Sequence, residues 1–377
     1  MASKLQSETE WIETPVGLIP SREFAMNAAA AVCIVYHYNC TEQDLGSRGA
    51  TLDDSVASAK TGELVPPSAK SGAKVFDREA FVKAKELVSP SAISGDKVQP
   101  EVLQQVLALT GMANDCGCLF VKAIRSVPDL EIVSFCRNSA GAEIALCISE
   151  TCETINFIFR GTDTIYTCDL RDVAIDAQFL KTYLDDDADS VCCTGATSVH
   201  RGFWTQYISD GLKDTLLALA AENLQKYPKY KITCTGHSLG AALATLLAFE
   251  LSGLHKETCV QLVTFGSPRV GNYRFSELFA KRGNLRAVRF QNGNDIVTRI
   301  PMCNYKHVGT HVWIKEDGKT IVSDWRSPPM LATMPALSDW LMCDSCVLSG
   351  VKHLELEYAN AISIAECEFW MPADKKP

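Results

Sequence analysis

The chain has 377 residues, with 36 Lys and Arg against 45 Asp and Glu, so its formal net charge is −9. This acidic balance argues against a nucleic-acid-binding protein, because such a protein needs a basic face to neutralise phosphates. Hydrophobic residues make up 47% of the chain. That share excludes a wholly disordered protein and allows one large core.

The sequence predicts neither a transmembrane segment nor a secretory signal. The longest apolar runs, Ala28–Tyr36 and Ala241–Phe249, reach about half of the ~20 residues that a membrane-spanning helix needs. Met1–Glu10 is polar and lacks the apolar centre of a signal peptide. We therefore expect a cytoplasmic protein. The alternatives are secretion by a non-standard route and the mature form of an exported protein.

The 16 cysteines are interpreted mainly as reduced, buried thiols, because thiols of this kind pack as small hydrophobic groups. A loop disulfide is the alternative if the protein is exported. Cys343 and Cys346 have the spacing of zinc ligands, but no second pair lies at finger distance. The acidic run 185–189 imitates a calcium loop without its expected Gly and Glu. The sequence therefore predicts no metal site.

The first part of the chain predicts helices around a low-complexity insertion. Arg22–Tyr38 places apolar side chains at helical spacing. Residues 39–74 are rich in Ser, Gly, Ala and Asp, which favours an extended insertion. Phe76–Leu87 is predicted to be a short charged helix, and Pro100–Thr110 a helix that begins at proline.

From residue 119 onwards, strand-like runs alternate with helical ones. The expected strands are Leu119–Ile124, Glu131–Phe135, Glu143–Ser149, Thr154–Phe159, Lys231–Thr235, Val260–Phe265, Arg286–Gln291 and His311–Lys315. The expected helices are Gly202–Gln225, Leu239–Leu251, Tyr273–Arg282 and Val351–Ile362. This alternation predicts an α/β fold with a mostly parallel central sheet and helices on both faces. We expect two units: residues 1–98, a helix and insertion that pack on the core, and residues 99–377, the α/β domain.

A turn between the expected strand and helix at residues 231–251 carries Gly-His-Ser-Leu-Gly, which fits the pattern G-x-S-x-G. Gly236 and Gly240, on either side of His237 and Ser238, leave room for the close approach of strand and helix. The Ser238 hydroxyl would then project above the edge of the sheet. The first amides of the helix, Leu239 N–H among them, would favour negative charge at the same point. The pattern thus favours a nucleophilic Ser238 over a structural turn serine.

Five stretches resemble the class 3 (fungal-type) lipase family of the α/β-hydrolase superfamily, in the family's order. They are Phe159–Thr162, Val199–Phe203, Thr233–Ala244, Val263–Asn272 and Asn294–Pro301. The resemblance covers about residues 119–360. It implies an α/β-hydrolase fold and a serine carboxylester hydrolase that needs no cofactor. It also implies that Asp295 is the catalytic acid and that Thr162 is the second oxyanion donor beside Leu239.

The catalytic base has three candidates. In α/β-hydrolases the triad order along the chain is Ser, acid, His, and only His307, His311 and His353 follow Asp295. We favour His353, because its segment resembles a late segment of the family and begins a helix after a loop. His307 is the second candidate and His311 the third.

The expected substrate is a lipid or another ester, with a lipid–water interface as one setting. The leading hypothesis is a triacylglycerol or acylglycerol lipase that works through a Ser-Asp-His triad and an acyl-enzyme. The alternatives are phospholipase A1, another lipid or feruloyl-type esterase, and a lipase-like interaction protein without catalysis. Residues 163–198 occupy the position of the family's lid, but Ile165–Leu184 lacks the Trp that is often found there.

Overall fold

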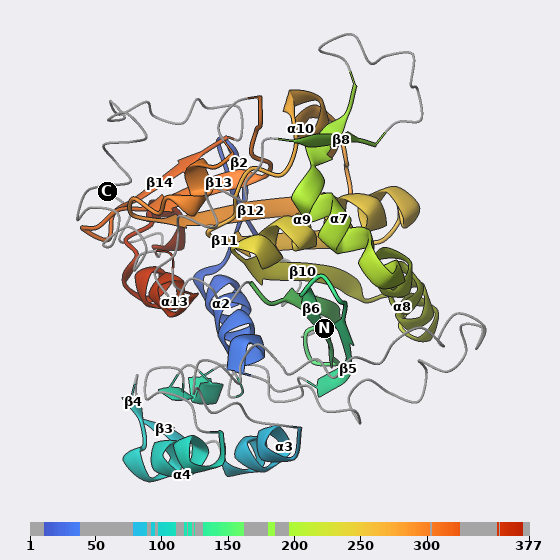
Figure 1. The fold of residues 1–377 in the computed structure, drawn as a ribbon. Coiled ribbons are helices and arrows are strands. Elements are labelled where there is room, and N and C mark those ends of the chain that lie inside the picture. The colour runs from blue at the N-terminus through green and yellow to red at the C-terminus, as the bar shows by residue number, and fades with distance from the viewer. Residues whose placement is uncertain are drawn as a thin grey trace, which may run out of the picture.

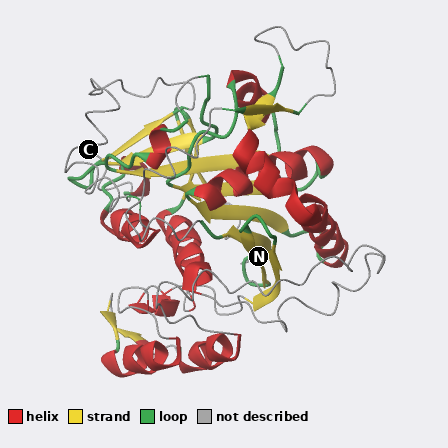
Figure 2. Cartoon of the chain, viewed as in Figure 1, coloured by secondary structure: helices red, strands yellow, loops and turns green. Residues whose placement is uncertain are grey.

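A mostly parallel sheet between two layers of helices forms the centre of the protein (Figures 1 and 2). The structure is a computed structural model. It describes residues 11–37, 78–88, 92–94, 97–110, 117–118, 120–122, 124, 131–161, 180–184, 196–301, 304–324, 353 and 355–371.

The central sheet has eight strands in the order β14-β13-β12-β11-β10-β7-β6-β5. The bounds are β5 Glu131–Arg137, β6 Glu143–Ser149, β7 Thr154–Phe159, β10 Lys231–His237, β11 Val260–Phe265, β12 Leu285–Asn292, β13 Thr310–Ile314 and β14 Thr320–Ser323. Neighbours from β7 to β13 pair in parallel, whereas β5, β6 and β14 pair antiparallel at the two edges. Apart from Lys231, every residue of β10 and β11 is buried, as expected for central parallel strands covered on both faces.

Helices cover both faces of this sheet, and each face has its own hydrophobic cluster. On one face, α2 and α13 contact each other and the strands (Figure 1). On the other face, α7, α8 and α9 pack together, and α9 lies directly on β10 and β11. The helix bounds are α2 Arg22–His37, α3 Arg78–Leu87, α4 Pro100–Thr110, α7 Arg201–Ile208, α8 Leu212–Lys226, α9 Leu239–Leu254, α10 Tyr273–Ala280 and α13 Glu355–Ile364. The predicted fold class is confirmed.

Smaller elements complete the fold. The hairpin β1–β2 packs beside β12 and β13, and β8 pairs with β9 antiparallel. The bounds are β1 Trp11–Thr14, β2 Gly17–Pro20, β3 Ile93–Ser94, β4 Lys97–Val98, β8 Lys181–Tyr183 and β9 Ser198–His200. Short 3-10 helices span Ser209–Gly211, Val297–Arg299 and Glu368–Trp370. The strands β1 to β4 were not predicted from the sequence.

The strand expected at Leu119–Ile124 is wrong, because residues 120–122 and 124 are helical. Phe120, Val121 and Ile124 are nevertheless buried in the same cluster as α2. A short apolar run is compatible with a buried strand and with a buried helix, so periodicity alone does not separate the two.

The helix expected over Gly202–Gln225 is interrupted between α7 and α8. Asp210 and Gly211 have φ values of 55° and 68°, which ends one helix before the next begins. The Asp210 carboxylate accepts a hydrogen bond from Ser139 N at 2.6 Å. This contact fixes the break to the turn between β5 and β6.

The N-terminal helix α2 shares its hydrophobic cluster with residues of β11, β12 and α13. The boundary between residues 98 and 99 stays a prediction. The insertion at 39–74, Cys343, Cys346, the acidic run 185–189 and most of the lid segment 163–198 lie outside the described residues. Among the thiols that are described, Cys147 on β6 and Cys234 on β10 are buried, and burial raises the pKa of Cys147 to about 12.

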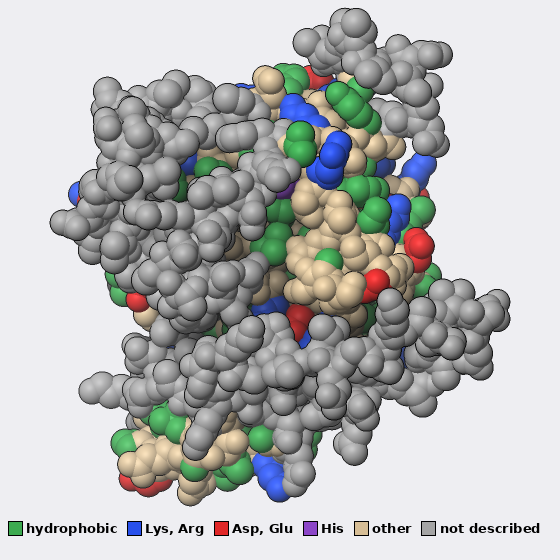
Figure 3. Space-filling model, viewed as in Figure 1, with side chains coloured by type: hydrophobic (Ala, Val, Ile, Leu, Met, Phe, Trp, Pro, Cys, Tyr) green, Lys and Arg blue, Asp and Glu red, His purple; other side chains and the backbone are tan. Residues whose placement is uncertain are grey.

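Within the described ranges, every helix is too short or too polar to cross a bilayer. The same ranges hold no group of three or more His, Cys, Asp or Glu side chains placed to share a metal ion. Figure 3 shows acidic and basic side chains interspersed on the described part of one face. One ion pair of the described residues joins Lys213 Nζ and Glu250 Oε1 at 3.1 Å.

Candidate active site

The turn between β10 and α9 holds Ser238 in a strained conformation. Its φ and ψ are 56° and −127°, a region that a residue with a side chain rarely adopts and that is typical of a nucleophile elbow. The flanking glycines are required by contact: a Cβ on Gly236 would lie 2.5 Å from Gly240 O, and a Cβ on Gly240 would lie 2.6 Å from Phe159 O. The elbow therefore folds only with glycine at both positions.

Three side chains far apart in the sequence meet at this elbow. His353 Nε2 lies 2.8 Å from Ser238 Oγ, and His353 Nδ1 lies 2.7 Å from Asp295 Oδ2. Ser238 is 3% exposed, and the other two are 0% exposed. Ser238 and Asp295 follow the carboxyl ends of β10 and β12, and His353 lies just before α13.

The other two histidine candidates bond elsewhere. His307 Nε2 donates to Thr298 O at 2.7 Å, and His311 Nε2 lies 3.1 Å from Gln291 Oε1. Of the three histidines after the acid, the structure therefore places His353 in contact with Ser238.

Asp295 is held by several donors. Val297 N donates to Oδ1 at 2.9 Å, and Tyr358 Oη donates to Oδ2 at 2.5 Å. Burial and the charge of Asp295 raise the pKa of Tyr358 well above its ordinary value, so this hydroxyl stays protonated and donates. Tyr358 was not predicted as a site residue. The sequence does place Tyr358 five residues after His353, in the expected helix, and this spacing could have indicated a contact with the site.

Gly266, directly after β11, makes room for the His–Asp pair. Its φ is +59°. A Cβ there would lie 2.8 Å from His353 Cε1 and 3.0 Å from Asp295 Oδ2. Both the backbone conformation and the missing side chain are needed at this position.

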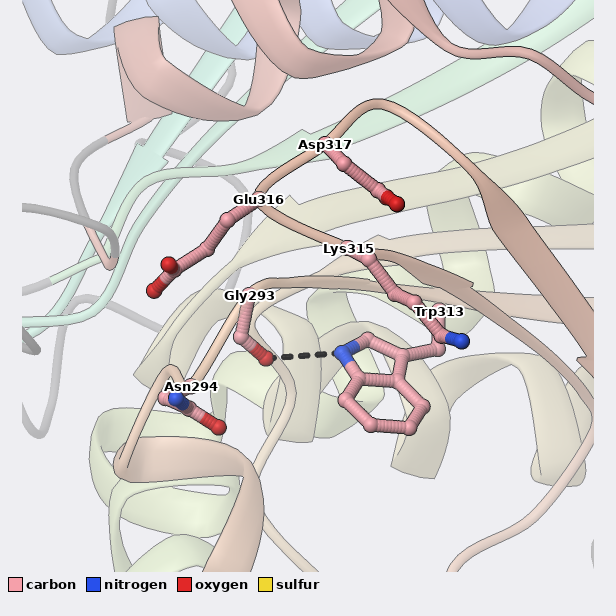
Figure 4. A pocket seen from close by; sticks show the side chains of 6 residues that line it. All are labelled: Gly293, Asn294, Trp313, Lys315, Glu316 and Asp317. Atoms are coloured by element: carbon pink, nitrogen blue, oxygen red, sulfur yellow. Dashed lines mark hydrogen bonds between the residues drawn. The ribbon is translucent and has the colours of Figure 1, made fainter.

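The loop that carries Asp295 is braced by Trp313 on β13. Trp313 Nε1 donates to Gly293 O at 2.8 Å (Figure 4), and Gly293 N donates to Ile314 O at 2.7 Å. These groups border a pocket of about 380 Å³, lined by Gly293, Asn294, Trp313, Lys315, Glu316 and Asp317. The pocket lies behind the acid and includes neither Ser238 nor His353. We interpret its lining as support for the acid loop.

Of the two expected oxyanion donors, Leu239 is the first residue of α9. Amides in the first turn of a helix have no acceptor within the helix and carry partial positive charge. Leu239 N–H is therefore available for an anion near Ser238 Oγ. Thr162 lies outside the described residues, although the preceding Gly161 is described at the end of β7.

The strand–elbow–helix unit and the chain order Ser, Asp, His define an α/β-hydrolase. Residues 156–305 match the family described as "Lipase (class 3)", and this range contains Ser238 and Asp295. Over these residues the chain is similar to class 3 lipases.

Several lipases and phospholipases are similar to parts of the chain. A "Secreted mono- and diacylglycerol lipase A" from Penicillium cyclopium is 30% identical over 182 residues, 47% of this chain and 53% of that protein. "Phospholipase A1-II 1" from Oryza sativa subsp. indica is 40% identical over 101 residues, 26% of this chain and 25% of that protein. The chain thus spans about half of the Penicillium relative and a quarter of the rice relative. Among solved structures, the triacylglyceride lipase of Rhizomucor miehei is 24% identical, with a TM-score of 0.45, over 63% of this chain and 80% of that one.

The expectation of a cytoplasmic protein is wrong. It rested on the polar stretch Met1–Glu10, whereas the Penicillium relative is named as a secreted protein. A polar stretch at one end says nothing about where the folded domain works.

Proposed function

We propose that the protein is a serine carboxylester hydrolase that cleaves acylglycerols through a Ser238–His353–Asp295 triad. The observation that carries this proposal is the hydrogen-bonded row from Ser238 Oγ through His353 to Asp295 Oδ2, with distances of 2.8 and 2.7 Å. A serine hydroxyl is a weak nucleophile until a base takes its proton, and the acid holds that base in the required tautomer.

The reaction follows from this row. Ser238 Oγ attacks the ester carbonyl carbon while its proton moves to His353 Nε2. The imidazolium so formed is stabilised by Asp295 and then protonates the leaving alcohol, which leaves an acyl-enzyme on Ser238. Water, deprotonated by His353, attacks this ester, and the fatty acid leaves as Ser238 regains its proton.

The negative charge of each tetrahedral intermediate would rest on the oxyanion donors. We propose Leu239 N–H, at the start of α9, as one donor, supported by its place in the first helical turn. Thr162 is proposed as the second, supported by its match to the family's oxyanion segment. Loss of one such donor typically raises the activation barrier by about 3 kcal/mol.

An acylglycerol is the preferred substrate class because the Penicillium relative is named a mono- and diacylglycerol lipase. The second candidate is the sn-1 ester of a phospholipid, favoured by the rice phospholipase A1. An extracellular site of action is proposed on the same ground, the secreted Penicillium relative. The division into residues 1–98 and a catalytic unit 99–377 is likewise our proposal.

Two measurements test the proposed function. A fluorophosphonate probe should label the full chain once, and Ser238→Ala should remove the label while the circular dichroism spectrum is retained. A panel of mono-, di- and triacylglycerols and phosphatidylcholine then separates the two substrate classes. A chain that is folded but is neither labelled nor active would reject the enzyme in favour of a non-catalytic interaction protein.

A further inference from the structure

The side chain of Tyr36, in the last turn of α2, reaches the active site from the opposite end of the sequence. Tyr36 Oη lies 2.9 Å from His237 Nδ1, and His237 Nε2 bonds to the backbone carbonyl of His353. The rings of His237 and His353 lie with centroids 4.6 Å apart. Tyr36, His237 and His353 are all buried. A chain of hydrogen bonds thus connects helix α2 to His353, whose ring contacts Ser238.

The direction of each hydrogen bond in this chain is fixed by chemistry. A carbonyl oxygen only accepts, so His237 must carry a proton on Nε2. Burial, with the nearby His353 ring as the second cause, lowers the pKa of His237 well below its ordinary value, so the ring is neutral. Its Nδ1 is therefore an acceptor, and the Tyr36 hydroxyl donates to it.

We propose that Tyr36 is a positioning residue for the base His353 and acts through His237. This inference rests on the proposed function, which makes His353 the base. The Tyr36 hydroxyl selects the His237 tautomer that can donate to the His353 carbonyl. That bond in turn fixes the backbone of a residue whose ring must meet Ser238 and Asp295 at the same time.

The segment that follows β7, Arg160 and Gly161, also lies close to the Tyr36 side chain. A Cβ on Gly161 would lie 2.0 Å from Tyr36 Oη and 2.8 Å from His237 O. Only glycine therefore fits beside the hydrogen-bonded chain from Tyr36 through His237 to His353, which we call the relay. The guanidinium of Arg160 lies 5.7 Å from the centroid of the Tyr36 ring. Arg160 and Gly161 lead into Thr162, the proposed oxyanion residue. Helix α2 therefore contacts the base side and the oxyanion side of the site together.

The variant Tyr36→Phe tests this role, because it removes the hydroxyl and keeps the buried ring. Loss of one orienting hydrogen bond should lower kcat about tenfold at unchanged KM. Fluorophosphonate titration counts the intact sites, so a purely structural defect would lower this count and leave the rate per titrated site unchanged. Tyr207→Phe is the matched control, since Tyr207 is fully buried and its hydroxyl has no hydrogen-bond partner among the described residues.

An unchanged rate per titrated site in Tyr36→Phe would overturn the proposal, and so would an equal loss in Tyr207→Phe. A second variant asks whether His237 transmits the effect. His237→Gln offers an amide donor and a carbonyl acceptor and should keep more activity than His237→Leu, which offers neither. Equal rates in these two variants would also contradict the relay.

A readout independent of activity is the ¹⁵N NMR spectrum of histidine-labelled protein, with the His237 signals identified by the His237→Gln variant. We expect a proton on Nε2 and a hydrogen-bonded, unprotonated Nδ1 whose resonance moves in Tyr36→Phe. A proton on Nδ1 of His237 in the wild-type protein would refute the relay. If the folded wild-type protein did not react with the fluorophosphonate, the proposed function would be wrong. The NMR spectrum would still show whether the hydrogen bonds from Tyr36 through His237 exist.

Discussion

Tyr358 donates its hydroxyl hydrogen bond to Oδ2 of Asp295, the same carboxylate oxygen that His353 Nδ1 contacts. Helix α13 therefore positions two donors around the acid, because His353 lies just before it and Tyr358 lies on its first turns. With Val297 N on Oδ1, the carboxylate has little freedom to rotate. The Asp295 carboxylate is therefore already oriented as its proposed role requires.

Replacing Tyr358 by Phe should loosen this carboxylate without leaving a cavity. We expect a loss of about 1 kcal/mol in the free energy of unfolding and a fall of about tenfold in kcat, since one buried hydrogen bond is removed. Urea unfolding and steady-state hydrolysis of a soluble ester measure the two effects. Wild-type kcat in this variant would mean that Val297 N alone orients the acid.

The choice of base is tested by His353→Ala and His307→Ala. Loss of the base should lower kcat about 10⁴-fold or more in His353→Ala, while His307→Ala, which removes a bond to Thr298 O, should stay active. Thermal unfolding checks that both proteins are folded. Full activity of His353→Ala would transfer the role to His307.

Gly266→Ala should displace the His353–Asp295 pair. The added Cβ would lie 2.8 Å from His353 Cε1 at a positive φ, so the His–Asp pair has to move. We expect hydrolysis to fall about 100-fold or more, because small misplacements of catalytic groups have effects of this size. Gly283→Ala is the control, since within the described part of the chain its Cβ would meet no atom within 4 Å. Comparable losses in both variants would show a general effect on folding.

The pH dependence of stability should reflect histidines that are neutral in the folded protein, one of them buried and two partly buried. Burial lowers the pKa of His237, His307 and His311 well below 6.5. Below pH ~6.5 the unfolded chain therefore binds protons that the folded chain does not, and the free energy of unfolding falls as the pH falls. Each histidine contributes about 1.4 kcal/mol per pH unit in this window and nothing above it.

Urea midpoints between pH 7.5 and 5 measure this slope. The variant His311→Gln removes one titrating ring while its amide can still bond to Gln291, so its slope should be shallower by about one histidine's share. A slope identical to that of the wild-type protein would show that His311 is protonated in the folded state.

The sequence was sufficient for features that depend on local pattern and chain order. The buried runs predicted β10 and β11, and the glycines around Ser238 placed a sharp turn between β10 and α9. The Ser–acid–His order narrowed the base to three histidines. The contacts of His353 then came from the structure.

Features that depend on packing between distant segments were not predicted. Tyr36 precedes His237 by 201 residues, and no spacing rule connects the two. The role of Gly266 is visible only once the His–Asp pair lies beside it. The strand prediction for residues 119–124 was wrong for a related reason, because the same apolar side chains fit a buried helix as well as a buried strand.

The proposed base, His353, lies 115 residues after the proposed nucleophile and 58 residues after the proposed acid. During synthesis, the ribosome therefore completes the whole parallel sheet, elbow included, before the imidazole exists. A nascent chain can fold its central strands around an inert serine. The proposed ester hydrolysis would therefore become available only when α13 docks against β12 and α2.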